Sequence, residues 1–76
     1  MFVPTFDIFA GTPGSLNVLW KEAVPGLGAA SERMQQLAAE DPGPYFVFCI
    51  SSRQVLAVVD TSGQQQQQER RFRRGA

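Results

Sequence analysis

The stretch that decides the fold is "PGLGAASERMQQLAAEDPG", residues 25–43, where the apolar residues recur with the spacing of a helix. They fall at i, i+3, i+7, i+10 and i+11, the pattern of one helical face, and they are Leu27, Ala30, Met34, Leu37 and Ala38. Asp41 stands before Pro42, which disfavours helical backbone angles at Asp41, and a glycine follows. The sequence therefore predicts one helix, about 13 residues and ~20 Å long.

The residues before this helix predict a hairpin. Residues 3–9 are rich in aromatic and branched side chains, and Phe6 and Ile8 share one parity, as in a strand with a drier face. "GTPGS", residues 11–15, has the glycines and the proline of a turn. "LNVLWKEAV", residues 16–24, carries polar residues on both parities. It therefore predicts a second strand without a clean dry face.

The residues after the helix predict a second hairpin. "PYFVFCI", residues 44–50, is apolar on both parities, which is typical of a central strand with both faces at least partly covered. A short polar loop separates it from the branched run "VLAVVD", residues 55–60. The order β-β-α-β-β predicts a small α+β domain, in which one helix packs on one face of an antiparallel sheet of about four strands.

One helix covers only one face of such a sheet, so the other face should carry uncovered apolar side chains. We therefore expect a protein-interaction or self-associating module, either a homodimer or the binder of a protein partner. The pattern leaves open which parity the helix covers. The candidates for the core are Phe6, Trp20, Phe46 and Phe48, and those for the open, partner-binding face are Phe9, Leu19 and Tyr45.

The net charge of the 76 residues is zero, but the charge is divided unevenly. Residues 1–60 hold three basic and six acidic residues, whereas residues 61–76 hold four arginines and one glutamate. Beyond residue 62 the chain adds little that a core could use, which predicts a single domain over residues 1–62 and a disordered Gln/Arg-rich tail over 63–76. The alternative function is weak nucleic-acid binding by this tail, through Arg70, Arg71, Phe72, Arg73 and Arg74.

The sequence offers little for catalysis. It has no histidine, and Cys49 is its single cysteine. We expect Phe48 and Ile50 beside it to raise the pKa of the thiol, leaving Cys49 a buried hydrophobe without a base to activate it. The glycines of "GTPGS" and "PGLGAAS" match neither the Walker A nor the dinucleotide pattern. We therefore predict a protein that is not an enzyme and that has no cofactor and no metal.

The first residues, "MFVPTFDIFAG", contain no basic segment and no uninterrupted apolar run, so they do not predict a signal peptide. No apolar stretch approaches the ~20 residues that span a bilayer. With one unpaired cysteine as well, the expected location is the cytoplasm, away from membranes.

The aromatic run "PGPYFVFCI" has a superficial likeness to the aromatic strand of RNA-recognition motifs, on which bases stack. It lacks the preceding basic residue and the small residue between two aromatics, and residues 1–60 are acidic. A core strand is therefore the better interpretation.

Residues 5–62 also resemble a class of short uncharacterised bacterial proteins. The shared features are a tryptophan strand, a "V-x-G-L-x-x-A" helix start and a "Y-F-V-F" strand, here at Trp20, residues 24–30 and residues 45–48. The resemblance implies a domain that ends near residue 62, and it implies no activity and no functional residues.

Overall fold

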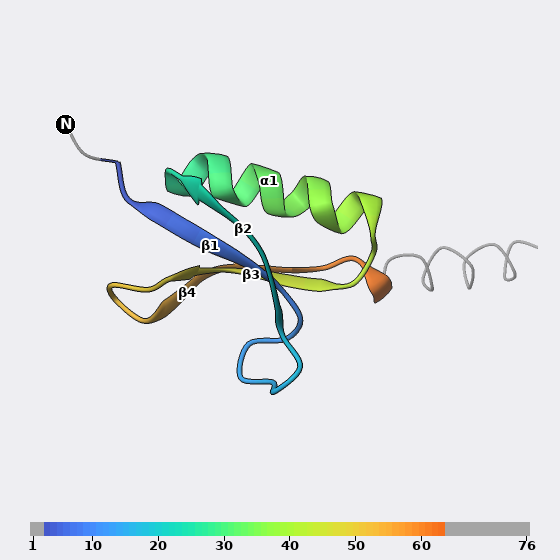
Figure 1. The fold of residues 1–76 in the computed structure, drawn as a ribbon. Coiled ribbons are helices and arrows are strands. Elements are labelled where there is room, and N and C mark those ends of the chain that lie inside the picture. The colour runs from blue at the N-terminus through green and yellow to red at the C-terminus, as the bar shows by residue number, and fades with distance from the viewer. Residues whose placement is uncertain (1–2, 64–76) are drawn as a thin grey trace, which may run out of the picture.

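A computed structural model of the chain describes residues 3–63 (Figure 1). In chain order its elements are β1 (Thr5–Ala10), β2 (Leu19–Pro25), α1 (Leu27–Glu40), β3 (Pro44–Cys49) and β4 (Gln54–Asp60). This is the predicted β-β-α-β-β order of an α+β domain with one helix. The predicted tail, apart from Gly63, lies outside the described residues.

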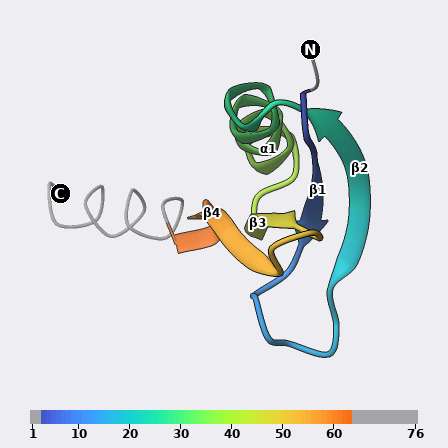
Figure 2. The same cartoon turned by 90° about the vertical axis from the view of Figure 1, so that its left-hand side faces the viewer.

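The four strands form one antiparallel sheet in the order β2-β1-β3-β4. Because β2 and β3 both run antiparallel to β1, they are parallel to each other, and parallel strands cannot be joined by a tight turn. The helix α1 makes this connection and lies across one face of the sheet (Figures 1 and 2). The two apolar strands β1 and β3 consequently take the central positions, and β2 and β4 form the edges.

Both edge strands are irregular. The register shifts between Ile8 and Phe9, where β2 carries Lys21 as an extra residue, and between Val47 and Phe48, where β4 carries Leu56. Such bulges bend a strand and increase its local twist. In Figure 2 the β1–β2 pair accordingly runs in a different direction from β4.

Glycine rather than a polar side chain begins the helix. Gly26, the N-cap, has a φ of 89° and makes no side-chain capping bond. Its N–H donates to the carbonyl of Pro4 at 2.8 Å, which ties the helix start to the beginning of β1. At the other end the N–H of Asp41 donates to the carbonyl of Leu37 at 2.9 Å, and Pro42 follows, as predicted for the stop.

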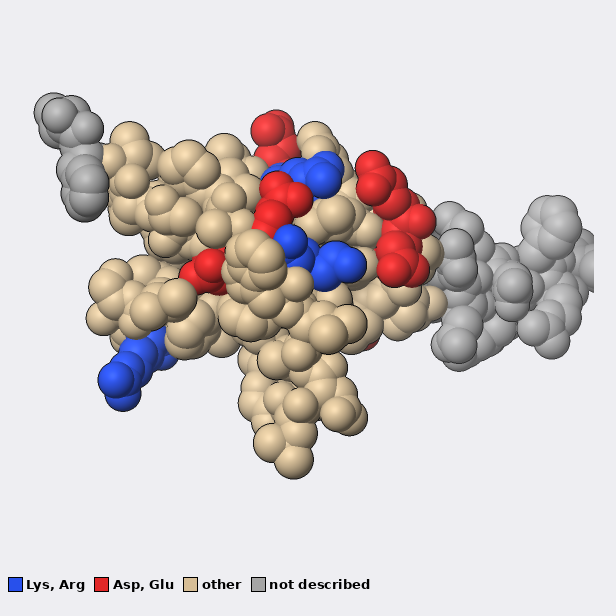
Figure 3. Space-filling model, viewed as in Figure 1, with Lys and Arg blue, Asp and Glu red and all other residues tan. Residues whose placement is uncertain are grey.

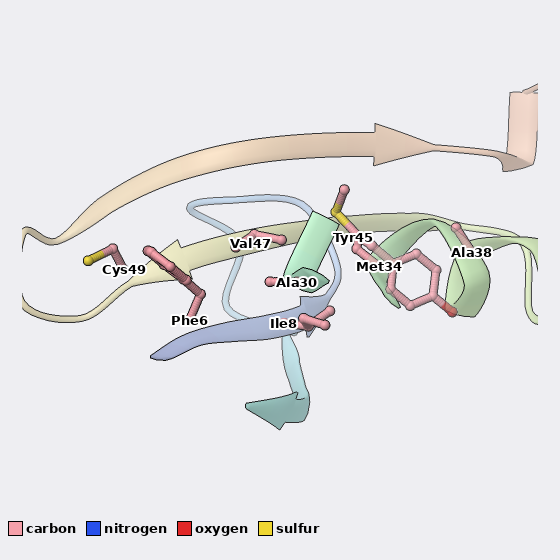
Figure 4. Close-up of a cluster of buried hydrophobic side chains, with 8 residues drawn as sticks. All are labelled: Phe6, Ile8, Ala30, Met34, Ala38, Tyr45, Val47 and Cys49. Carbon is pink, nitrogen blue, oxygen red and sulfur yellow. The ribbon is translucent and has the colours of Figure 1, made fainter. Parts of the chain in front are cut away.

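The core lies between the helix and one face of the sheet (Figure 4). The helix contributes two alanines and a methionine, and the small alanines let it lie close to the strands. The buried residues of this cluster are Phe6, Ile8, Ala30, Met34, Ala38, Tyr45, Val47 and Cys49. The placement of Phe6 in the core is thus confirmed.

Tyr45 was expected on the open face, and that expectation is wrong: its side chain is 3 % exposed and lies under the helix. Its hydroxyl donates to the backbone carbonyl of Asp41 at 2.7 Å, so the ring fills the core while its polar tip is satisfied at the helix end. Burial, and then the charges of Asp41 and Glu40, raise the pKa of Tyr45.

A threonine joins three elements at this same end of the domain. The Thr61 hydroxyl donates to the carbonyl of Ala38 at 2.8 Å and accepts from the N–H of Gly43 at 3.1 Å. The Thr61 N–H donates to the Gly43 carbonyl at 3.1 Å. The last turn of α1, the start of β3 and the end of β4 are therefore held together.

Within residues 3–63, no helix has the length and apolar character needed to cross a membrane.

Candidate functional site: an aromatic sheet face

A row of apolar side chains crosses the face of the sheet that the helix leaves bare. Phe9 is paired with Trp20 on β2 and with Phe46 on β3, and Phe46 is paired with Val58 on β4. Residues directly opposite each other in an antiparallel ladder point to the same face. Since Ile8 and its partner Val47 point toward the helix, this row points away from it.

A second row runs beside the first. Asp7 is paired with Ala23 and with Phe48, and Phe48 with Val55. We call these two rows the open face; its members are Asp7, Phe9, Trp20, Ala23, Phe46, Phe48, Val55 and Val58.

The aromatic rings of the open face are ordered by contacts with one another. Phe9 stacks on Phe46 with ring centroids 5.2 Å apart and meets Phe48 edge-on at 6.3 Å. The indole N–H of Trp20 donates to a carboxylate oxygen of Asp7 at 2.9 Å. Asp7 is the one charged member of the face, and this bond engages it without removing the tryptophan ring from solvent.

The β1–β2 loop, residues 11–18, borders the open face, and its sequence determines its shape. The N–H of Ser15 donates to the carbonyl of Thr12 at 3.0 Å. Between them Pro13 fixes one corner and Gly14 has a φ of 87°, the geometry of a type II turn. At the neck of the loop Gly11 has a φ of 131°, and a Cβ there would lie 2.8 Å from Val18 Cγ1.

The loop and the open face border a shallow, open groove of about 200 Å³. Its walls are Pro13, Gly14 and Val18 from the loop and Phe9, Phe46, Phe48 and Val55 from the sheet. Figure 1 shows the loop projecting from the sheet on the side away from α1. No wall residue is charged, and the volume is below the ~300–1,000 Å³ of typical small-molecule sites, so the groove suits one apolar side chain better than a metabolite.

Of the three residues predicted for the open face, the structure places one on it. Phe9 lies on the open face and lines the groove. Leu19 does not belong to the face: it is paired with Ala10, which packs against the helix-side core, and it is 67 % exposed at the sheet margin. Tyr45 is in the core, as described above.

Three residues predicted for the core, Trp20, Phe46 and Phe48, instead lie on the open face. Phe46 is nevertheless buried, because Phe9 stacks on it. The groove residues that the sequence did not single out are Pro13, Gly14, Val18 and Val55. The strand register would have placed Val55, but the three loop residues had no signal beyond that of a turn.

Charged side chains concentrate elsewhere. Figure 3 shows acidic and basic groups gathered over the helix and β2, while the loop projecting at the bottom of the view carries none. Arg33 Nε lies 3.1 Å from a carboxylate oxygen of Glu22, which joins α1 to β2. At the end of β4, hydrogen bonds from Ser62 lower the pKa of Asp60.

Cys49 lies at the far end of β3 and is 9 % exposed. Hydrogen bonds, first from the Ser51 hydroxyl and then from Ser52, lower the pKa of Cys49 to about 7 and outweigh the opposing effect of burial. The expected raised pKa is therefore wrong, because the serines after the strand turn back toward the sulfur; the Ser51 Oγ lies 3.4 Å from Sγ. In the described part of the chain, no three His, Cys, Asp or Glu side chains are grouped to hold a metal.

Neither a protein-family model, nor a curated protein, nor a solved structure matches this chain. The resemblance to short bacterial proteins stays a prediction, and the site rests on its own geometry.

Proposed function

We propose that the protein works by binding another polypeptide through the open face. The observation that carries this proposal is the exposure of the row Trp20–Phe9–Phe46–Val58: its outer members, Trp20 and Val58, are 58 % and 61 % exposed. A contiguous apolar surface bordered by polar residues is typical of a protein interaction site.

The energetics favour this use of the face. Fully burying a valine side chain stabilises a complex by roughly 1.5–3 kcal/mol, and tryptophan is among the commonest interface anchors. The Phe9–Phe46 stack and the bond from Trp20 to Asp7 already restrict these side chains, so binding costs less conformational entropy than it would for free rotamers. In this proposal the face contributes affinity, and none of its residues has a catalytic role.

Site-specific photo-crosslinking tests the proposal. A benzophenone side chain is placed at Val58 on the open face, or at Gln35, an exposed position on the helix, and the full chain is irradiated in cells of its source organism. A discrete crosslinked species from position 58, absent from position 35 and lost when Trp20→Ser is added, is the expected result. Equal crosslinking at the two positions, or none at either, contradicts the proposal.

The basic tail supports a second, weaker candidate, nucleic-acid binding, which rests on the uneven charge of the sequence. If Arg70, Arg71, Arg73 and Arg74 each contact a phosphate, the logarithm of the binding constant for single strands should fall with the logarithm of the salt concentration, at a slope of about −3. The test compares the full chain with a variant carrying glutamine at all four positions, at low salt. Equal binding by the two proteins, or none by either, removes this candidate.

A further inference from the structure

We infer that the partner of the open face is a second copy of this chain, and that Leu16 at the tip of each β1–β2 loop enters the groove of the other copy. This inference rests on the proposed function and names its partner.

Leu16 is the projecting element of the inferred contact. It is 99 % exposed, the highest value among the exposed large apolar residues of the described chain. The loop that presents it is held by the Thr12–Ser15 turn and by a bond from the Asn17 N–H to the Ser15 hydroxyl at 3.2 Å. A side chain presented on a preorganised loop loses little entropy on docking.

The groove is the receiving element. Its walls are uncharged and largely apolar, and its volume of about 200 Å³ accommodates a leucine side chain. Phe9, Phe46 and Phe48 form its base, and the rim is completed by Val55, which is 40 % exposed. Leucine against aromatic rings is an apolar contact that leaves no polar group unsatisfied.

The placement of these two elements favours a two-fold arrangement. The loop that carries Leu16 also supplies one wall of the groove, so the projecting and receiving elements are neighbours on one surface. A two-fold axis beside the groove then makes both insertions at once, as an isologous interface requires. Elements at opposite ends of the molecule would instead form rings or open chains of copies.

The distribution of charged residues favours this surface for contact between identical copies. Residues 1–60 hold three basic and six acidic residues, so this part of the chain carries the same net negative charge in two copies, which opposes their approach. Residues 11–18 and the groove walls contain no charged residue, and Asp7 on the face is hydrogen-bonded to Trp20. Among the residues of the loop and the open face, two copies therefore bring only one charged residue each to the contact, Asp7.

The size of the surface sets the strength of the contact. The loop and the open face together offer fewer residues than the ~20–30 a side of a standard interface. The expected dimer is therefore weak, with a dissociation constant of about micromolar size, and exchanges rapidly with monomer.

Sedimentation equilibrium of the full chain, from about 1 to 200 μM, tests the inference. The expected result is a concentration-dependent monomer–dimer equilibrium for the natural sequence. Leu16→Asp should raise the dissociation constant at least about tenfold, because both insertions are lost. Since Leu16 is almost fully exposed, the urea unfolding midpoint of the Leu16→Asp variant, measured at the lowest protein concentration, should equal that of the natural sequence. The matched control is Ile50→Asp, which places the same charge at a 65 % exposed apolar position in the other hairpin and should leave the dimer intact.

The arrangement itself is tested by a benzophenone at position 16 in a mixture of isotopically light and heavy chains. Crosslinks between light and heavy copies at the segment containing Phe46 and Phe48 are expected. A strict monomer at 200 μM, or a dimer that Leu16→Asp leaves unchanged, overturns the inference. If the purified chain is monomeric while position 58 still crosslinks another protein in cells, the second copy is excluded and the proposed function stands. If the purified chain is monomeric and position 58 crosslinks nothing, the inference and the proposed function are both wrong.

Discussion

The two faces of the sheet are built from the same strands and the same kinds of residue, yet only one is covered. On the helix side, Ile8 and Val47 are fully buried, and Tyr45 satisfies its hydroxyl at the helix end. On the open face, their chain neighbours Phe9 and Phe48 remain partly accessible, and Trp20 at the edge is more than half exposed.

This difference shows what an apolar strand does and does not specify. β3 is apolar on both parities, a pattern typical of strands that are covered on both faces. Within the described residues the chain supplies one helix and therefore one cover. On the open face the only comparable cover within the described residues is the loop of residues 11–18, which borders a shallow groove and leaves it open.

The largest expected difference between the two faces comes from truncating one branched side chain to alanine on each face. Ile8→Ala removes a fully buried side chain and should lower the free energy of unfolding by about 2–5 kcal/mol, a large part of the stability of a domain this small. Val58→Ala on the open face should change it by no more than about 0.5 kcal/mol at low concentration. Urea unfolding followed by circular dichroism gives both values. Equal losses would mean that the open face belongs to the folding core.

The next largest effect concerns the wall of the groove. Gly11→Ala combines a φ of 131° with a contact of 2.8 Å to Val18, and should cost roughly 1–3 kcal/mol. Gly28→Ala is the matched control: it lies in the helix, meets nothing within 4 Å, and should be stabilising by ~0.5–1 kcal/mol. Thermal unfolding of the two variants and of the natural sequence measures these changes in stability. A neutral Gly11→Ala would show that the loop neck adjusts freely, and the groove would lose its fixed wall.

The sequence predicted the elements of the fold because each has a local signal. Helical spacing indicated α1, the Asp41–Pro42 pair indicated its end, and runs rich in apolar residues between turn signals indicated the four strands. The face of each strand was harder, because β3 is apolar on both parities and alternation cannot distinguish them. Tyr45 goes to the helix side since it directly follows the short connection from α1, where its hydroxyl reaches the Asp41 carbonyl.

The candidate site depends on information that no single segment holds. Phe9, Phe46 and Val58 form one row only because the register aligns three strands, and Trp20 joins it because Lys21 is bulged out of β2. Without that bulge, alternation along β2 would give Trp20 the same side as Glu22, whose carboxylate pairs with Arg33 of the helix. The loop residues that line the groove could not be predicted either, because a turn motif predicts a bend in the chain but not which residues the loop packs against.

A smaller effect is expected at the rim of the helix side, where Glu22 pairs with Arg33. Both side chains are more than a third exposed, so Glu22→Gln should cost about 0.2–1 kcal/mol. The loss should shrink as salt rises toward about 1 M, since exposed charges are then screened. Glu32→Gln, which also removes an acid but breaks no ion pair within residues 3–63, is the control. If the two variants are equally stable at low salt, the ion pair adds nothing to the stability of the packing between α1 and β2.

The comparison sharpens at Cys49, which lies at the end of β3 in the helix-side core and is 9 % exposed. Hydrogen bonds from Ser51 and Ser52 lower the pKa of the thiol to about 7, below the ~8.5 of a free cysteine, so alkylation by iodoacetamide should reach half its maximal rate near pH 7. Ser51→Ala should move that midpoint upward. Because the folded pKa lies below the unfolded value, Cys49 contributes stability that is fully present above the unfolded pKa and is lost as the pH falls through about 7. Cys49→Ser should remove this part of the pH dependence of unfolding. A midpoint near 8.5 in the folded protein would show that the serines do not hold the thiolate and that this end of the core is as closed as the rest.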